Sequence, residues 1–199
     1  MTSLPWTPVK VAWISGVSDV GRHALSDRQR AFVDALPAPR RWKLHTNFPY
    51  APGGSDTALF RARHLLWAST INAARFVAAC QPLHRRARLD AWAELKASCD
   101  TLLLISLSCG SQIAWSMERC RPDGAEVSML SLGPVDFGCG YIPRRVVVGA
   151  EDRVSPCPGR GDAIRLPGVG HLDYAASGLA LDEASQWVED QLERVQVAP

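Results

Sequence analysis

The chain has 199 residues and is 47% hydrophobic, which is enough for a single domain over residues 1–199 with a substantial core. A net charge of +2 does not indicate nucleic-acid binding, and no apolar run approaches the roughly 20 residues that a membrane-spanning helix needs. The six cysteines include no C-x-x-C pair, so we expect no zinc site. Residues 1–10 lack the features of a secretory signal, so we expect a cytoplasmic protein with reduced cysteines.

The first half of the chain alternates between predicted strands and helices. A β-branched and aromatic run predicts a buried strand over 9–15, followed by a loop over 16–21. A helix fits 26–36, because Ser26 or Asp27 can cap it and Pro37 ends it. The further elements of this half are a strand over 41–48 and helices over 56–79 and 86–98.

The second half continues the alternation. It contains an apolar strand that begins at Thr101, a helix from Ser111 to about Cys120, strands over 126–132, 145–149 and 163–166, and a terminal helix over 181–195. This pattern predicts an α/β fold with a mostly parallel sheet of about six strands flanked by helices. Ligands of such sheets bind at the carboxyl ends of the strands, which directs attention to the residues that follow each strand.

The stretch from Asp100 to Trp115 is the most informative part of the chain and reads D-T-L-L-L-I-S-L-S-C-G-S-Q-I-A-W. A buried strand that turns sharply into a helix, with a serine at the turn, is typical of a nucleophile elbow. Ser108 is therefore the candidate nucleophile. The turn is strained and needs small neighbours, which here are Ser106, in place of the first glycine of G-x-S-x-G, and Gly110. Ser111 is expected to cap the helix that follows.

The last two predicted strands also end in chemically useful residues, because Asp152 follows the fifth and His171 follows the sixth. A serine hydroxyl needs a histidine to take its proton, and the histidine needs an acid to orient it and to stabilise the imidazolium. Asp136, after the fourth strand, is an alternative acid, and Cys109 is an alternative nucleophile one position out of register.

The order Ser, Asp, His, the elbow S-L-S-C-G-S and the segments V-V-V-G-A-E-D-R-V-S-P and L-P-G-V-G-H-L-D resemble the α/β-hydrolase superfamily. The resemblance implies a catalytic triad of Ser108, Asp152 and His171. It also implies an oxyanion hole with one backbone donor from Cys109 and a second near Val17, although the loop after the first strand has no H-G-G-G run.

The link between residues 132 and 145 is short, which implies a small member of the superfamily without a cap domain. Ser18, Tyr50 and Phe137 are the candidates for the substrate pocket. The predicted function is that of a serine hydrolase, an esterase or thioesterase, acting on a small-molecule acyl substrate through an acyl-enzyme intermediate without a metal or cofactor.

Two alternatives remain, because some members of the superfamily have lost hydrolysis. The chain could be a binding or accessory protein with an unused triad, which a test for a reactive serine would distinguish. It could also be a non-hydrolytic acyltransferase or cyclase that uses the same site, which the product formed would distinguish.

Overall fold

The computed structural model describes residues 4–16, 24–48, 85–136, 141–155 and 162–197. Its centre is a sheet of six parallel strands in the order β2-β1-β3-β4-β5-β6. The strands are β1 (Val9–Ser15), β2 (Lys43–Phe48), β3 (Thr101–Leu107), β4 (Glu126–Leu132), β5 (Arg144–Gly149) and β6 (Ile164–Leu166). The predicted α/β class and the parallel sheet are therefore confirmed.

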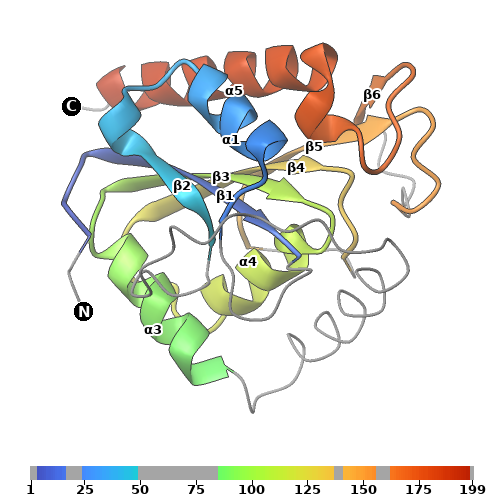
Figure 1. Cartoon of the computed structure of the whole chain (residues 1–199). Helices are drawn as coiled ribbons and strands as arrows, with labels where there is room; N and C mark the ends of the chain where they lie inside the picture. The colour runs from blue at the N-terminus through green and yellow to red at the C-terminus, as the bar shows by residue number, and fades with distance from the viewer. Residues whose placement is uncertain (1–3, 17–23, 49–84, 137–140, 156–161, 198–199) are drawn as a thin grey trace.

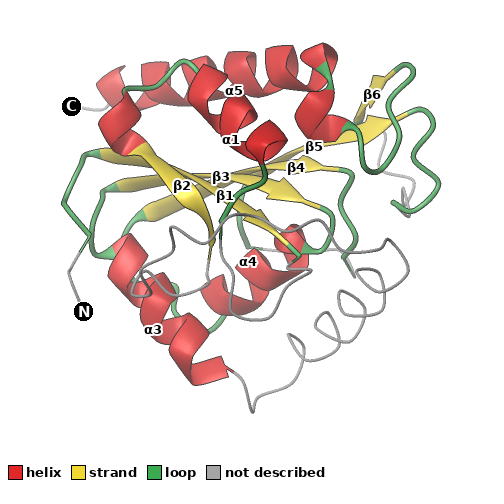
Figure 2. Cartoon of the chain, viewed as in Figure 1, coloured by secondary structure: helices red, strands yellow, loops and turns green. Residues whose placement is uncertain are grey.

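Helices cover both faces of the sheet (Figure 1). On one face lie α1 (Asp27–Ala35) and α5 (Gly178–Val197), and on the other lie α3 (Arg85–Lys96) and α4 (Gly110–Glu118), as Figure 2 shows. Two short 3₁₀ turns, η1 (Arg40–Trp42) and η3 (Tyr174–Ala176), complete the described elements. None of the helices in the described ranges is long and apolar enough to cross a membrane.

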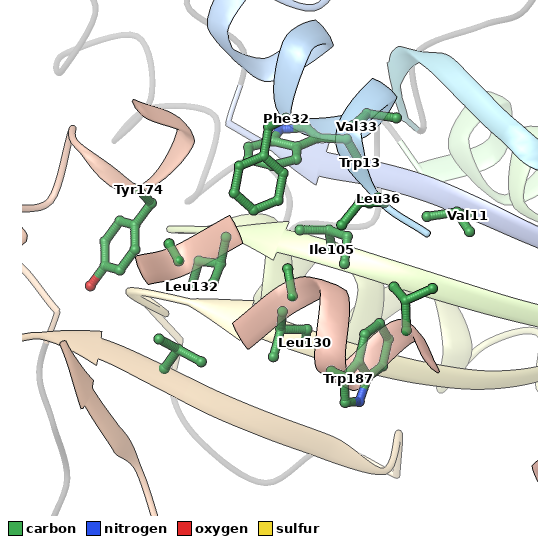
Figure 3. Close-up of a cluster of buried hydrophobic side chains, with 14 of the residues drawn as sticks. Val11, Trp13, Phe32, Val33, Leu36, Ile105, Leu130, Leu132, Tyr174 and Trp187 are labelled. Carbon is green, nitrogen blue, oxygen red and sulfur yellow. The ribbon is translucent and has the colours of Figure 1, made fainter. Parts of the chain in front are cut away.

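Side chains of β1, β3 and β4 alternate between two buried hydrophobic clusters, one on each face of the sheet. In β3, Leu103 and Ile105 pack in the cluster beneath α1 and α5, whereas Leu102 and Leu104 pack in the cluster beneath α3 and α4. The apolar run in the sequence thus reflects a strand that is buried on both sides. Figure 3 shows the first cluster, in which Trp13 meets the ring of Phe32 edge-on at 5.5 Å between centroids.

Element boundaries differ from the predictions at several ends. The second strand begins at Lys43 and not at 41, because residues 40–42 form η1. The terminal helix begins earlier than expected, at Gly178, and the Ser177 hydroxyl accepts a hydrogen bond from the Ala180 N–H at 3.3 Å. The predicted helix over 56–79 lies outside the described residues. The link from β4 to β5 is also only partly described, at 133–136 and 141–143, and no helix occurs in those parts.

The strand order has a switch point beside the predicted elbow. The chain passes from β1 to β2 on one side and then returns to β3 on the other side of β1. Adjacent connections that leave in opposite directions open a crevice at the carboxyl ends of these strands, where ligands of open α/β sheets bind. Ser108 follows β3 directly and therefore lies at this switch point.

Candidate active site

Ser108 occupies a tight turn between β3 and α4. Its φ of 55° makes it the one non-glycine residue with a positive φ in the described part of the chain. The turn is fixed on both sides, because the Ser108 N–H donates to the Leu132 carbonyl at 3.1 Å and its carbonyl accepts from the Val135 N–H at 3.0 Å. A non-glycine residue in this region stores backbone strain, and such strain gathers at functional sites.

The two small residues that flank Ser108 have different roles. A Cβ atom on Gly110 would lie 2.1 Å from the Ile14 carbonyl oxygen, so α4 starts where only glycine fits against β1. Ser106 is fully buried, and its hydroxyl lies 3.1 Å from Ser131 Oγ and 3.3 Å from the Leu130 carbonyl. The serine in place of the first elbow glycine is therefore accommodated with hydrogen-bond partners for its hydroxyl.

The helix after the elbow begins earlier than the sequence suggested. Its N-cap is Cys109, and Ser111 already lies within α4. The expectation that Ser111 caps the helix is therefore wrong. The sharp turn at Ser108 places the N-cap at Cys109, two residues before Ser111, and the Ser111 hydroxyl instead donates to the Ser108 carbonyl at 3.2 Å.

Three side chains from separate strand ends meet at Ser108. His171 Nε2 lies 3.0 Å from Ser108 Oγ, within hydrogen-bond distance. On the other side of the ring, His171 Nδ1 lies 3.0 and 3.1 Å from the two carboxylate oxygens of Asp152. The structure thus brings together the serine, histidine and aspartate that the sequence singled out, in one hydrogen-bonded series.

Asp152 is held by more donors than the histidine alone. Its side chain is fully buried, and Oδ1 accepts the backbone N–H groups of Val154 and Ser155, both at 2.9 Å. Oδ2 accepts the Tyr174 hydroxyl, also at 2.9 Å. Burial by itself raises the pKa of Asp152, but these hydrogen bonds and the one from His171 outweigh it and hold the pKa below its ordinary value.

Comparisons with known proteins agree with this architecture. No protein-family model matches the chain, and no characterised protein matches it in sequence. Among solved structures, esterase PE8 is 15% identical, with a TM-score of 0.51 and coverage of 96% of each chain. MGS-MChE2, an α/β hydrolase enzyme from the metagenome of sediments of the Mar Chica lagoon in Morocco, is 12% identical. Its TM-score is 0.52, and the match covers 96% of this chain and 93% of that one.

The chain has the α/β-hydrolase fold. At these identities the likeness establishes the architecture alone. Within this fold, Ser108 lies at the turn after β3, and Asp152 and His171 follow β5 and β6.

The alternative residues occupy other environments within the α/β-hydrolase fold. Asp136 Oδ2 forms an ion pair with Arg144 Nη1 at 2.6 Å, and both side chains are mostly buried. Cys109 is also buried, and this burial raises the pKa of its thiol to about 11, which disfavours the thiolate that a cysteine nucleophile needs. The contacts to the two ring nitrogens of His171 described above come from Ser108 and Asp152.

Part of the predicted site lies beyond what the structure describes. Val17, Ser18, Tyr50 and Phe137 all fall outside the described residues, so the second oxyanion donor and the substrate pocket stay predictions. Cys109 is described and stands at the N-cap of α4, directly after Ser108. No cluster of three metal-binding side chains occurs within the described ranges.

Two residues beside Asp152 were not predicted from the sequence. Tyr174 contacts Asp152, but a tyrosine three positions after a histidine carries no recognised signal. Gly133 follows β4 with a φ of 50°, and a Cβ there would lie 2.6 Å from Asp152 Oδ2 and 2.8 Å from the Tyr174 hydroxyl. The sequence feature that could have indicated Gly133 is its position directly after a predicted strand. Its missing side chain leaves the space that the acid and the tyrosine occupy.

The lowered pKa of Asp152 predicts how this carboxylate contributes to stability at different pH values. Because its pKa is lower in the folded chain, the ionised group stabilises the fold above the unfolded value of about 3.9. That contribution is lost as the pH falls through the folded value. We expect the difference in unfolding free energy between wild type and Asp152→Asn to be constant above about pH 5 and to shrink below about pH 4. Urea denaturation of both proteins over this range measures the difference, and one independent of pH would contradict the expectation.

Proposed function

We propose that the protein is a serine hydrolase that cleaves a small ester or thioester through an acyl-enzyme intermediate. The observation that carries the proposal is the series from Ser108 Oγ through His171 to Asp152, with contacts of 3.0 to 3.1 Å. It is built at the carboxyl ends of β3, β5 and β6, where ligands of this fold bind.

In the proposed reaction, Ser108 Oγ attacks the acyl carbon and passes its proton to His171 Nε2. Asp152, ionised and facing Nδ1, stabilises the imidazolium that forms. His171 then gives the proton to the leaving group, which departs as an alcohol or thiol. A water molecule, deprotonated by the same imidazole, hydrolyses the acyl-enzyme and restores Ser108.

The negative charge on the substrate oxygen needs donors that are already oriented toward it. Cys109 follows the nucleophile at the start of α4, where the first backbone N–H groups of a helix have no partner within the helix. The positive end of the helix dipole adds to this stabilisation. We assign the Cys109 N–H as one oxyanion donor, and a backbone N–H near Val17 as the other.

Two observations support hydrolysis over a purely binding role. A binding protein has no need of a serine held in a left-handed turn against a histidine, whereas an activated nucleophile does. The structural neighbours named above are an esterase and a hydrolase, which supports the same reaction class for this chain. Ester and thioester substrates share this chemistry, and Ser18, Tyr50 and Phe137 are proposed to line the acyl pocket.

A fluorophosphonate probe tests the proposal, because it labels a serine only when the hydroxyl is activated. We expect covalent labelling at Ser108, located by mass spectrometry, and its loss in Ser108→Ala. The matched control is Ser116→Ala in α4, the helix that follows Ser108; the Ser116 hydroxyl donates to the Ile113 carbonyl at 2.8 Å. This variant should be labelled like wild type. Folded wild-type protein that resists the probe would refute the proposed function.

A further inference from the structure

Tyr174 joins the hydrophobic core to the proposed catalytic acid. It opens η3, three residues after His171, and it is fully buried. Its ring packs in the cluster beneath α1 and α5, and Figure 3 shows its hydroxyl pointing away from the other side chains of that cluster. The hydroxyl has two partners, the Gly149 N–H at 2.7 Å and Asp152 Oδ2 at 2.9 Å.

The direction of these two hydrogen bonds is fixed by their chemistry. A backbone N–H can only donate, so the phenol oxygen accepts from Gly149. The single phenol proton is then available for Asp152 Oδ2, which as an ionised carboxylate can only accept. The Tyr174 hydroxyl therefore donates to Asp152, and its orientation is fixed by the hydrogen bond from the N–H of Gly149, the last residue of β5.

The carboxylate of Asp152 consequently has a donor at each oxygen besides the histidine. Backbone N–H groups of Val154 and Ser155 hold Oδ1, and the Tyr174 hydroxyl holds Oδ2. His171 Nδ1 lies almost equally far from both oxygens, at 3.0 and 3.1 Å. Without the tyrosine hydroxyl, the histidine would be the one partner left to Oδ2 among the described residues, and the carboxylate would be anchored by donors at Oδ1 alone.

The segment that carries the base also carries Tyr174. The Asp173 N–H donates to the Gly170 carbonyl at 3.1 Å, and the Gly170 N–H donates back to Asp173 Oδ2 at 3.2 Å. This local closure places His171 and Tyr174 on one compact turn, with both side chains directed at Asp152. His171 and Tyr174, which both contact Asp152, are thus fixed relative to each other.

We propose that Tyr174 is a positioning residue of the active site, whose hydroxyl holds Asp152 in the plane and orientation that His171 needs. The inference rests on the proposed function, since it concerns the same acid. It goes beyond that function because the tyrosine acts through Asp152 and does not touch the reacting atoms. Its effect on the rate should therefore depend on the presence of the carboxylate.

A double-mutant cycle tests this dependence, with the rate of fluorophosphonate labelling at Ser108 as the readout. Tyr174→Phe should label about tenfold more slowly than wild type, the effect expected for one hydrogen bond to a charged group. In an Asp152→Ala background the same change should alter the rate less than about twofold, because the group it acts on is gone. Ser98→Ala is the matched control.

The control removes another buried hydroxyl, one that donates to the Leu95 carbonyl at 2.6 Å. Ser98 precedes β3, whereas Ser108 follows it, so the two lie at opposite ends of that strand. We expect this variant to label at the wild-type rate, even if its melting temperature falls.

Each other outcome has one meaning. No labelling of wild type refutes the proposed function itself. Labelling of wild type and Tyr174→Phe at equal rates overturns the role of the tyrosine while leaving the proposed function intact. If Tyr174→Phe slows labelling equally with and without the Asp152 carboxylate, the proposed role of the tyrosine is also overturned, because Tyr174 then acts on the fold and not through the acid.

A second variant covers the case in which Tyr174→Phe does not fold. Incorporation of 3-fluorotyrosine at position 174 keeps the ring and the hydroxyl but makes the hydroxyl a stronger donor. It should move the proton NMR resonance of His171 Nδ1–H, which reports the hydrogen bond to Asp152. A resonance that stays at the wild-type position would overturn the proposal.

Discussion

Replacement of His171 by alanine is expected to lower kcat for ester hydrolysis by about 10⁵- to 10⁶-fold, the loss typical of a triad that acts as a unit. The reason is that His171 Nε2, 3.0 Å from Ser108 Oγ, is the proposed acceptor of the serine proton. Without that acceptor the hydroxyl is a poor nucleophile near neutral pH. Initial rates with a simple activated ester such as p-nitrophenyl acetate measure the effect.

The triad interpretation also predicts that losses do not add. The Ser108→Ala/His171→Ala double variant should be no slower than either single variant, because each already removes the same step. The matched control is His45→Ala, which breaks another histidine–aspartate contact, His45 Nε2 to Asp34 Oδ1 at 2.7 Å, on an exposed surface. We expect wild-type activity from this control. A folded His171→Ala enzyme that kept even a tenth of wild-type activity would rule out His171 as the base.

Replacement of Gly110 by alanine is expected to lower the free energy of unfolding by about 3 kcal/mol or more. The added Cβ would lie 2.1 Å from the Ile14 carbonyl oxygen and 2.7 Å from its carbon, and both are backbone atoms that cannot rotate away. α4 would have to move off β1, and the elbow would move with it. Because a domain of this size is stabilised by only about 5–15 kcal/mol, the loss is a large fraction of the total. Urea denaturation measures it.

Gly178 provides the matched control, because it is the first residue of α5 as Gly110 is of α4. A Cβ on Gly178 would meet no atom of the described residues within 4 Å outside its own helix and chain neighbours. Gly178→Ala should therefore leave stability unchanged or raise it by up to about 1 kcal/mol, through the better helix propensity of alanine. If Gly110→Ala and Gly178→Ala changed the free energy of unfolding by similar amounts, the close approach of α4 to β1 would not explain the glycine at position 110.

Local sequence features predicted most of the described architecture. The bounds of β1 and β4 agree with the prediction, because both strands are mostly buried and apolar residues predominate in their sequences. Capping also has a local signature, and Ser26 and Gln29 form the capping box that starts α1. At η1 the prediction was less successful, since Arg41 and Trp42 fit an alternating strand pattern as well as a turn.

The residues of the candidate site differ in how far the sequence reveals them. Ser108 carries its own signal, because the elbow is a local turn with a demand for small neighbours. Asp152 and His171 were selected because each follows a predicted strand and because the segments around them resemble those of the α/β-hydrolase superfamily. Asp136 satisfied the first of these criteria, and its pairing with Arg144 became visible only in the folded chain.

By itself the sequence determined the parallel α/β sheet, the elbow and the three residues to examine, because these depend on apolar periodicity and on the order of residues after strands. The tertiary structure decided the rest. Contacts between distant residues depend on strand order and on the packing of the intervening turns, which no local pattern encodes. Only the fold brings His171 within 3.0 Å of Ser108, 63 positions away, and sets the Tyr174 hydroxyl between Gly149 and Asp152.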